Sequence, residues 1–156
     1  MYQRLTPDMV AQLSSIVGSV IYDDPERMLN YAHDEMAGQE YAHMPEVVVK
    51  PESAAQIAAI MQWANRQRVP VTPRGAGSGL SGGAVPVYGG ILLSLERMNR
   101  ILEIDRQNMV VVVEPGVVTN DINEAIREFG LFYAGYPMSV ESCFIGGNVA
   151  ENAGGG

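Results

Sequence analysis

The sequence has one cysteine, Cys143, among 156 residues, so the chain cannot form an internal disulfide. Its 10 Lys and Arg residues against 18 Asp and Glu give a net charge of −8, without the clustered basic residues of nucleic-acid or anionic membrane-surface binders. The apolar runs "ILLSL" and "MVVVV" are far shorter than the roughly 20 residues of a membrane-spanning helix. The N-terminal "MYQRLTPDMVAQ" lacks an apolar secretory core. These absences favour a small-molecule function in a reducing cytoplasm.

Apolar residues make up 47% of the sequence and occur in short periodic runs, which is typical of a globular domain. Near the N-terminus, Thr6 is a candidate helix N-cap and Pro7 a candidate first helical residue. We therefore expect a helix whose buried face is formed by Met9, Val10, Leu13, Ile16, Val17 and Val20. Residues 22–45 are polar and irregular, and they predict a loop that contains one helical turn.

Short strands and one helix are expected in the next part of the chain. The β-branched and apolar segments 46–50, 69–73 and 91–95 are typical of strands. After the first of them, Ser53 and Gln56 form a capping box, and a helix is expected to run to about Arg68. Its expected apolar stripe consists of Ile57, Ile60, Met61 and Ala64, with Trp63 opposite that stripe or at its edge and packed against a neighbouring element. Strand, helix and strand in this order predict a right-handed parallel crossover.

The pattern changes after Leu95. The segments "ILEID" and "MVVVVEPG", separated by "RQN", predict an antiparallel hairpin. A helix is expected from about Thr119, with Ile122, Ile126 and Phe129 inward and Gly130 as its C-terminal stop. The rest of the chain is rich in glycine, and its glycines repeat the dense pattern of the first loop.

These elements predict an α+β fold built from two α/β subdomains. Residues 1–44 are expected to form the N-terminal helix and the irregular segment. Residues 45–97 are expected to form the first subdomain, with a small parallel sheet and a crossover helix. Residues 98–156 are expected to begin a second subdomain that is incomplete, and the boundary is expected near residues 97–100.

The stretch "PRGAGSGLSGG", residues 73–83, carries the strongest chemical signal. Gly77, Gly79 and Gly82 match G-x-G-x-x-G, but that dinucleotide fingerprint needs a helix that starts in the loop, and "GAVPVYGG" cannot start one. A phosphate P-loop is excluded because no Gly-Lys-Ser/Thr is present. A loop without a helix remains, whose backbone N–H groups form an anion-binding nest. A flexible surface turn is the alternative, and the arginine and serines at fixed places argue against it.

Two long motifs resemble a known family. "TPRGAGSGLSGG" and "IGGNVAENAGG" together are similar to the FAD-binding (PCMH-type) domain of the vanillyl-alcohol-oxidase flavoprotein superfamily, in the branch of glycolate oxidase flavoprotein subunits and D-lactate dehydrogenases. "YAHDEMAG" (residues 31–38), "PEVVVKP" and "VEPGV" match that family at corresponding places. The resemblance covers nearly the whole chain from about residue 20 onward.

The resemblance implies two α/β subdomains with FAD held between them. It places the pyrophosphate against the first loop, at Pro73, Arg74, Gly75, Ala76, Gly77, Ser78, Gly79, Leu80, Ser81 and Gly82. It places the flavin and its ribityl chain along Tyr136, Pro137, Cys143, Gly146, Gly147 and Asn148. Where many relatives have Pro-Asp-Pro-Ser, this chain has Gly-Tyr-Pro-Met at residues 135–138, which makes that wall more apolar. The first loop has no histidine for covalent attachment, so we expect non-covalent FAD.

The resemblance also implies that this chain is a fragment of a longer flavoprotein. The family's substrate domain supplies the histidines and arginine for oxidation of a 2-hydroxy acid, so no catalytic residue and no metal site is expected here. We expect the chain alone to be inactive and to retain FAD weakly at most. The parent would oxidise a D-2-hydroxy acid such as glycolate or D-lactate, with hydride passing to flavin. An electron-transfer flavoprotein or an iron–sulfur subunit is an expected partner.

Several other residues have simpler interpretations. His33 and His43 match no familiar metal-site spacing and are expected to be loop residues. Cys143 is expected to be a small packing residue near the flavin rather than a redox thiol. Glu114 is expected at an exposed strand end. A non-catalytic nucleotide- or flavin-binding module remains the alternative function, because phosphate cradling is common to carriers and enzymes. A structural oligomer partner is a weaker third reading.

Overall fold

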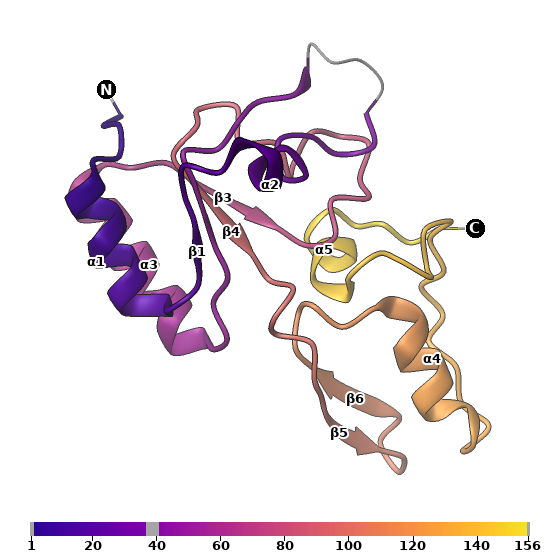
Figure 1. The fold of residues 1–156 in the computed structure, drawn as a ribbon. Coiled ribbons are helices and arrows are strands. Elements are labelled where there is room, and N and C mark those ends of the chain that lie inside the picture. Colours follow the sequence, from indigo (N-terminus) through magenta and orange to yellow (C-terminus); the bar gives the residue numbers. More distant parts are fainter. Residues whose placement is uncertain (1, 37–40, 156) are drawn as a thin grey trace.

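The structure is a computed structural model that describes residues 2–36 and 41–155. It is a mixed α/β chain with two sheets, and the predicted fold class is confirmed (Figure 1). The last two residues of the "YAHDEMAG" motif, Ala37 and Gly38, lie outside the described residues. No helix among the described residues is both long and apolar enough to cross a membrane.

The first sheet has four strands in the order β1-β2-β4-β3. The strands are β1 (Val20–Ile21), β2 (Val47–Val49), β3 (Val71–Arg74) and β4 (Ile91–Ser94). β2, β4 and β3 are parallel, whereas β1 pairs antiparallel with β2. The expected parallel crossover therefore exists, but β4 is inserted between the two strands that α3 connects. The β1 strand, two residues long, was not predicted.

Helices α1 (Pro7–Val17) and α3 (Ala54–Gln67) lie side by side on one face of this sheet (Figure 1). Both are capped as their sequences require: Thr6 Oγ1 accepts from Met9 N, and Ser53 Oγ accepts from Gln56 N. Side chains alternate along the strands, so Val47 and Val49 pack against these helices while Val48 faces α2 (Pro25–Leu29). The sheet is consequently buried on both faces, as parallel strands usually are.

Two details of this half differ from the sequence prediction. Val20 belongs to β1 and not to the first helix, because Gly18 ends α1 with a left-handed φ of 69°. Met61 is exposed. Trp63 packs against a neighbouring element as expected: it is buried against α1, and its indole Nε1 donates to Gln12 Oε1 at 2.8 Å. The α3 stripe is thus shifted toward α1, because the amphipathic tryptophan finds a polar partner there.

The second half contains the predicted hairpin, β5 (Ile101–Asp105) and β6 (Val110–Val113), and the predicted helix α4 (Thr119–Arg127). Ile122 and Ile126 of α4 pack with Val117 and Ile145, and the apolar face of the hairpin covers them. A short helix, α5 (Ile145–Ala150), was missed in the glycine-rich end. Glycine has a low helix propensity, so "IGGNVA" carries little helical signal.

Two further expectations about this half were wrong. Phe129 lies beyond the end of α4 and is only half-buried, with the Arg106 guanidinium over its ring at 4.7 Å. Glu114 is buried, not exposed, because its carboxylate binds Arg100 through the guanidinium and the backbone N–H. These hydrogen bonds lower the pKa of Glu114 and fix the base of the hairpin.

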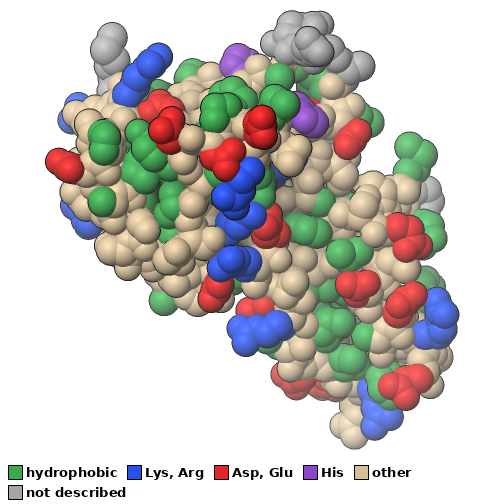
Figure 2. All heavy atoms as spheres, in the orientation of Figure 1, with side chains coloured by type: hydrophobic (Ala, Val, Ile, Leu, Met, Phe, Trp, Pro, Cys, Tyr) green, Lys and Arg blue, Asp and Glu red, His purple; other side chains and the backbone are tan. Residues whose placement is uncertain are grey.

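Ion pairs occur along the line where the two halves meet. Lys50 pairs with Glu96, Arg97 with Glu52, and Arg100 with Glu114. Figure 2 shows acidic and basic side chains next to one another along the middle of this face. Residues 95–100, which lead from the first sheet to the hairpin, are therefore held by ion pairs with residues on both sides.

The buried stripe of α3 can be tested by truncation. We expect Ile60→Ala to lower the free energy of unfolding by about 3 kcal/mol, because Ile60 is fully buried and the change leaves a cavity. Met61→Ala, at the next residue of the same helix, is the matched control and should change stability by less than about 0.5 kcal/mol. Urea unfolding of the two variants checks this, and equal losses would contradict the assigned core.

Candidate functional site

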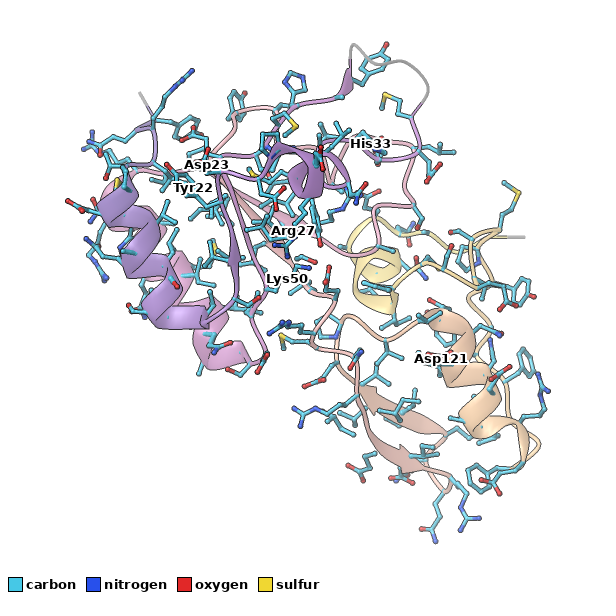
Figure 3. The ribbon with its side chains drawn as sticks, viewed as in Figure 1. Tyr22, Asp23, Arg27, His33, Lys50 and Asp121 are labelled. Carbon is cyan, nitrogen blue, oxygen red and sulfur yellow. The ribbon has the colours of Figure 1, made fainter. Side chains whose placement is uncertain are left out.

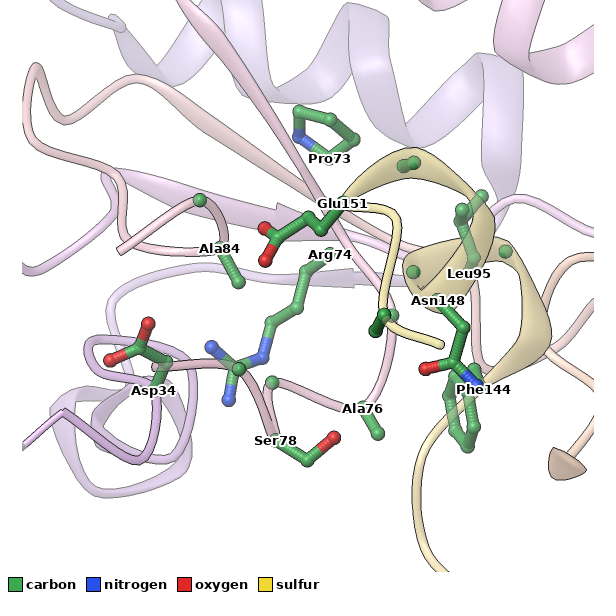
Figure 4. A pocket seen from close by; sticks show the side chains of 18 of the residues that line it. Asp34, Pro73, Arg74, Ala76, Ser78, Ala84, Leu95, Phe144, Asn148 and Glu151 are labelled. Carbon is green, nitrogen blue, oxygen red and sulfur yellow. The ribbon is translucent and has the colours of Figure 1, made fainter. Parts of the chain in front are cut away.

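A cavity of about 350 Å³ lies where the glycine loop after β3 meets α5. It is at the carboxyl edge of the parallel strands, since β3 ends at Arg74 and β4 is followed by Leu95, and both residues line it. Ligands of open α/β sheets bind at that edge because loops there leave a crevice. Figure 4 shows the loop and α5 on opposite sides of the cavity.

Most of the predicted site residues come together here. The predicted residues that line the cavity are Pro73, Arg74, Gly75, Ala76, Gly77, Ser78, Gly79, Gly146, Gly147 and Asn148. The others do not line it. Leu80 and Tyr136 are exposed, Ser81 and Gly82 lie farther along the loop, Pro137 is outside the lining, and Cys143 is buried behind it.

Several lining residues were not predicted. They are Asp34, Gly83, Ala84, Leu95, Ser139, Phe144, Ala150, Glu151 and Ala153. Asp34 and Glu151 stand within the motifs "YAHDEMAG" and "IGGNVAENAGG", so the resemblance pointed to their segments. The sequence alone does not show that their carboxyl groups reach one cavity, because more than a hundred residues separate them. The fold brings them together.

The backbone of the glycine loop has free donors. Among the described residues, none accepts a hydrogen bond from the N–H groups of residues 75–81. Residues 75–79 are half-buried, so these donors line a partly enclosed space rather than open solvent. A run of unpaired N–H groups is costly unless water or a ligand accepts from it, and it forms an anion-binding nest.

The guanidinium of Arg74 lies beneath this loop and donates hydrogen bonds to protein groups. It is 7% exposed, donates to the carbonyl oxygens of His33 at 2.6 Å and Asn30 at 3.2 Å, and lies 5.9 Å from the centre of the Tyr31 ring. Burial lowers the pKa of Arg74, and the nearby carboxylate of Asp34 opposes that shift. Arg74 therefore holds the loop in place, although it also lines the cavity.

Gly77 is required for this arrangement. Its φ is +78°, and a Cβ at this position would collide with the Arg74 guanidinium. Only glycine combines a left-handed backbone with this close approach. The carboxylate of Asp34 completes the support from the other side, accepting from Gly82 N at 2.8 Å and Met36 N at 2.9 Å.

Glu151 is the other carboxylate of the cavity. It follows α5, and Figure 4 shows it extending toward the loop. Its Oε2 accepts from the hydroxyl of Ser81 at 2.7 Å and would lie 3.3 Å from a Cβ at Gly79. The two walls of the cavity are thus joined by a side-chain hydrogen bond.

A charged network supports Arg74 from below. Glu96 accepts from Lys50 Nζ at 2.6 Å, from Ser94 Oγ at 2.8 Å and from the Tyr31 hydroxyl at 3.1 Å. Lys50, labelled in Figure 3, also lies 5.3 Å from the centre of the Tyr31 ring. Tyr31 therefore lies between the network and the guanidinium of Arg74, and it fixes the position of both.

The histidines do not contribute to the cavity lining. The ring Nδ1 of His33, labelled in Figure 3, lies 3.0 Å from the Asp34 carbonyl oxygen. Within the described ranges, no three His, Cys, Asp or Glu residues are placed to hold a metal ion. Cys143 is buried against Thr119 and Asn148.

Comparison with known proteins agrees with this geometry. The FAD binding domain family matches residues 45–156. The glycolate oxidase subunit GlcD of Bacillus subtilis is 40% identical over 152 residues, which cover 97% of this chain and 32% of that protein. The D-lactate dehydrogenase of Anaerostipes hadrus is 40% identical over 154 residues, or 99% of this chain and 32% of that protein. The chain therefore spans about a third of the length of these relatives.

A solved structure shares the fold. Alkyldihydroxyacetonephosphate synthase superposes with a TM-score of 0.86 over 99% of this chain and 30% of its own, at 20% sequence identity.

The charged network predicts a pH dependence of stability. Burial alone would raise the pKa of Glu96, but the hydrogen bonds from Lys50 and Ser94 outweigh it and lower that pKa below the usual range of a glutamate. Its stabilisation is thus complete above the ordinary pKa of a glutamate and is lost as the pH falls through the folded-state value. We expect the free energy of unfolding to fall more steeply between about pH 5 and pH 3 in the wild type than in Glu96→Gln.

Glu52→Gln is the control for this experiment. Its ion pair with Arg97 has both side chains substantially exposed, and such pairs contribute little. Urea unfolding at a series of pH values gives the three curves. Parallel curves for the wild type and Glu96→Gln would show that the network does not stabilise the ionised carboxylate.

Proposed function

The chain belongs to the FAD binding domain family, and on that premise we propose that it is the cofactor-binding part of a flavin-dependent oxidoreductase that acts on a D-2-hydroxy acid. The observation that carries the proposal is the cavity that the predicted glycine loop and the second glycine-rich segment form together. Residues 45–97 and 98–156 then supply its two walls, as two subdomains.

The first wall fits a pyrophosphate. The free N–H groups of residues 75–81 can donate to phosphate oxygens, and Ser78 and Ser81 add hydroxyl groups. The Ser81 hydroxyl donates to Glu151, so it would exchange that acceptor for a phosphate oxygen. Leu80 and Gly82 continue the loop beyond the cavity, and Gly82 N is already bound by Asp34.

The second wall fits a planar ring and its polyol chain. Gly146 and Gly147 present backbone without side chains, and Asn148 presents an amide. A Cβ at Gly146 would meet Pro115 Cβ at 2.6 Å, so packing within the chain requires that glycine. A Cβ at Gly147 would meet nothing within 4 Å, although Gly147 lies in a helix and lines the cavity. Nothing within the described chain requires glycine there, and a bound cofactor would.

The binding is proposed to be non-covalent. None of the described residues that line the cavity is His, Cys or Tyr, the side chains that could form a bond to the flavin ring. FAD supplies the acceptor for the hydride that leaves the substrate. The chain's own residues bind and orient the cofactor, and we assign no catalytic residue to them.

The substrate class and the partners are proposed from the relatives. Glycolate oxidase and D-lactate dehydrogenase both act on 2-hydroxy acids, and nearly the whole of this chain matches a part of each relative. We propose that substrate oxidation requires a further domain and that an electron-transfer flavoprotein or an iron–sulfur subunit accepts the electrons. A cytoplasmic location is proposed because the single cysteine, Cys143, is a buried free thiol.

Gly147 provides the test of the proposed cofactor position. We expect Gly147→Ala to weaken FAD binding at least tenfold, because its methyl group enters the space assigned to the cofactor. Thermal stability should be unchanged or slightly raised, since alanine is the better helix former. The measurement is a titration of the purified chain with FAD, followed by the quenching of flavin fluorescence, with a melting curve for each protein.

Gly154→Ala is the matched control. Gly154 has the same open space for a Cβ and no positive φ, but it does not line the cavity. It should bind FAD as the wild type does. Equal affinities of Gly147→Ala and the wild type would exclude this position for FAD. Absence of saturable binding to the wild type would show that the described walls do not hold the cofactor without further residues.

A further inference from the structure

Behind the second wall of the cavity, three polar side chains form a buried cluster: Thr119, Cys143 and Asn148. Their exposed fractions are 0%, 2% and 8%. Asn148 Nδ2 lies 2.7 Å from Thr119 Oγ1 and 3.2 Å from Cys143 Sγ, and Cys143 Sγ lies 3.4 Å from Thr119 Oγ1. Only Asn148 lines the cavity.

The hydrogens of this cluster all have acceptors. The two hydrogens of the Asn148 amide nitrogen go to Thr119 Oγ1 and Cys143 Sγ. The hydroxyl of Thr119 donates to the Cys143 carbonyl oxygen at 3.5 Å, and the thiol of Cys143 donates to Thr119 Oγ1. Thr119 Oγ1 accepts from both neighbours with its two lone pairs. The amide nitrogen of Asn148 is thereby directed away from the cavity.

The amide oxygen of Asn148 is left without a donor among the described residues. Every fully buried side-chain nitrogen or oxygen in the described part of the chain has a partner, so this unpaired oxygen is accessible. Because Asn148 is buried except toward the cavity, access comes from the cavity side. In Figure 4 the oxygen lies toward Ala76 of the opposite wall.

The backbone holds Thr119 in place. Its N–H donates to the Cys143 carbonyl oxygen at 3.1 Å, and Val118 forms an antiparallel bridge with Phe144. Ile145 N donates to the Val117 carbonyl oxygen at 2.9 Å on the other side of that bridge. The start of α4 and the start of α5 are therefore paired through backbone hydrogen bonds. The branched side chain of Thr119 has few rotamers available, so its hydroxyl has a fixed position.

We propose that Thr119 is a positioning residue that holds the Asn148 amide with its oxygen toward the cavity, where it accepts a hydrogen bond from an N–H or O–H group of the flavin or its ribityl chain. This inference rests on the proposed FAD site. It assigns Thr119 a role in binding although Thr119 itself does not line the cavity. Cys143 has the secondary role of accepting the other amide hydrogen.

The test compares Thr119→Val with Thr119→Ser. Valine has nearly the shape of threonine but no hydroxyl, so the amide loses its acceptor and can turn over. We expect FAD binding to weaken three- to tenfold, the usual effect of one lost hydrogen bond, and the visible absorption band of bound flavin to shift. Thr119→Ser keeps the hydroxyl and should restore the affinity and the spectrum. Melting curves separate these effects from a general loss of stability.

A second measurement needs no cofactor. In a ¹⁵N-labelled chain, Asn148→Leu identifies the side-chain NH₂ signals of Asn148 by their disappearance. In the wild type and Thr119→Ser, both hydrogens should exchange with water more slowly than those of exposed asparagines, whereas Thr119→Val should lose this protection. Fast exchange in the wild type would overturn the positioning role. Absence of FAD binding with protected NH₂ signals would instead contradict FAD binding by the described walls alone and leave the amide orientation established.

Discussion

The glycine loop keeps its shape because the Arg74 guanidinium is buried beneath it. A buried guanidinium is costly unless it is hydrogen-bonded and has an opposite charge nearby, and here two of its N–H groups donate to the carbonyl oxygens of Asn30 and His33 while Asp34 supplies that charge. The same contacts join residues 30–34 to the loop after β3. Gly77 lies over the guanidinium, so any larger residue would displace it. Removal of this charge would therefore release two segments and not one side chain.

This arrangement separates the support of the loop from its binding surface. The arginine and Asp34 use their polar atoms on protein groups, so the loop's own N–H groups are left for the ligand. The Lys50–Glu96–Tyr31 network stabilises the arginine from the other side, which extends the support into β4 and the segment after it. A helix is unnecessary after the loop, because the side chain of Arg74 fixes the backbone that a helix N-terminus would otherwise organise.

Sequence patterns predicted the parts of this fold that local signals determine. The capping box of α3 and the hairpin carry residues with strong local conformational preferences, and the composition of the glycine loop marks its place in the chain. The patterns failed where contacts between distant parts of the chain determine an element or the burial of a residue. β1 exists only because β2 offers an edge, and α5 forms although it contains two glycines. Met61, which was expected in the buried stripe of α3, is exposed. Glu114 was misjudged because its partner, Arg100, lies across the hairpin.

The cavity has charges that do not favour an anion at long range. Asp34 and Glu151 line it, and the single arginine among its described lining residues is buried, donates to backbone carbonyl oxygens and lies near Asp34. A pyrophosphate would thus be held by short, directional hydrogen bonds from the backbone rather than by attraction to a basic patch. Directional donors specify where each phosphate oxygen lies, and they act only within about 3 Å. The loop therefore fixes the position of one end of the cofactor, and the second wall, with Gly147 and Asn148, is left to fix the orientation of the other.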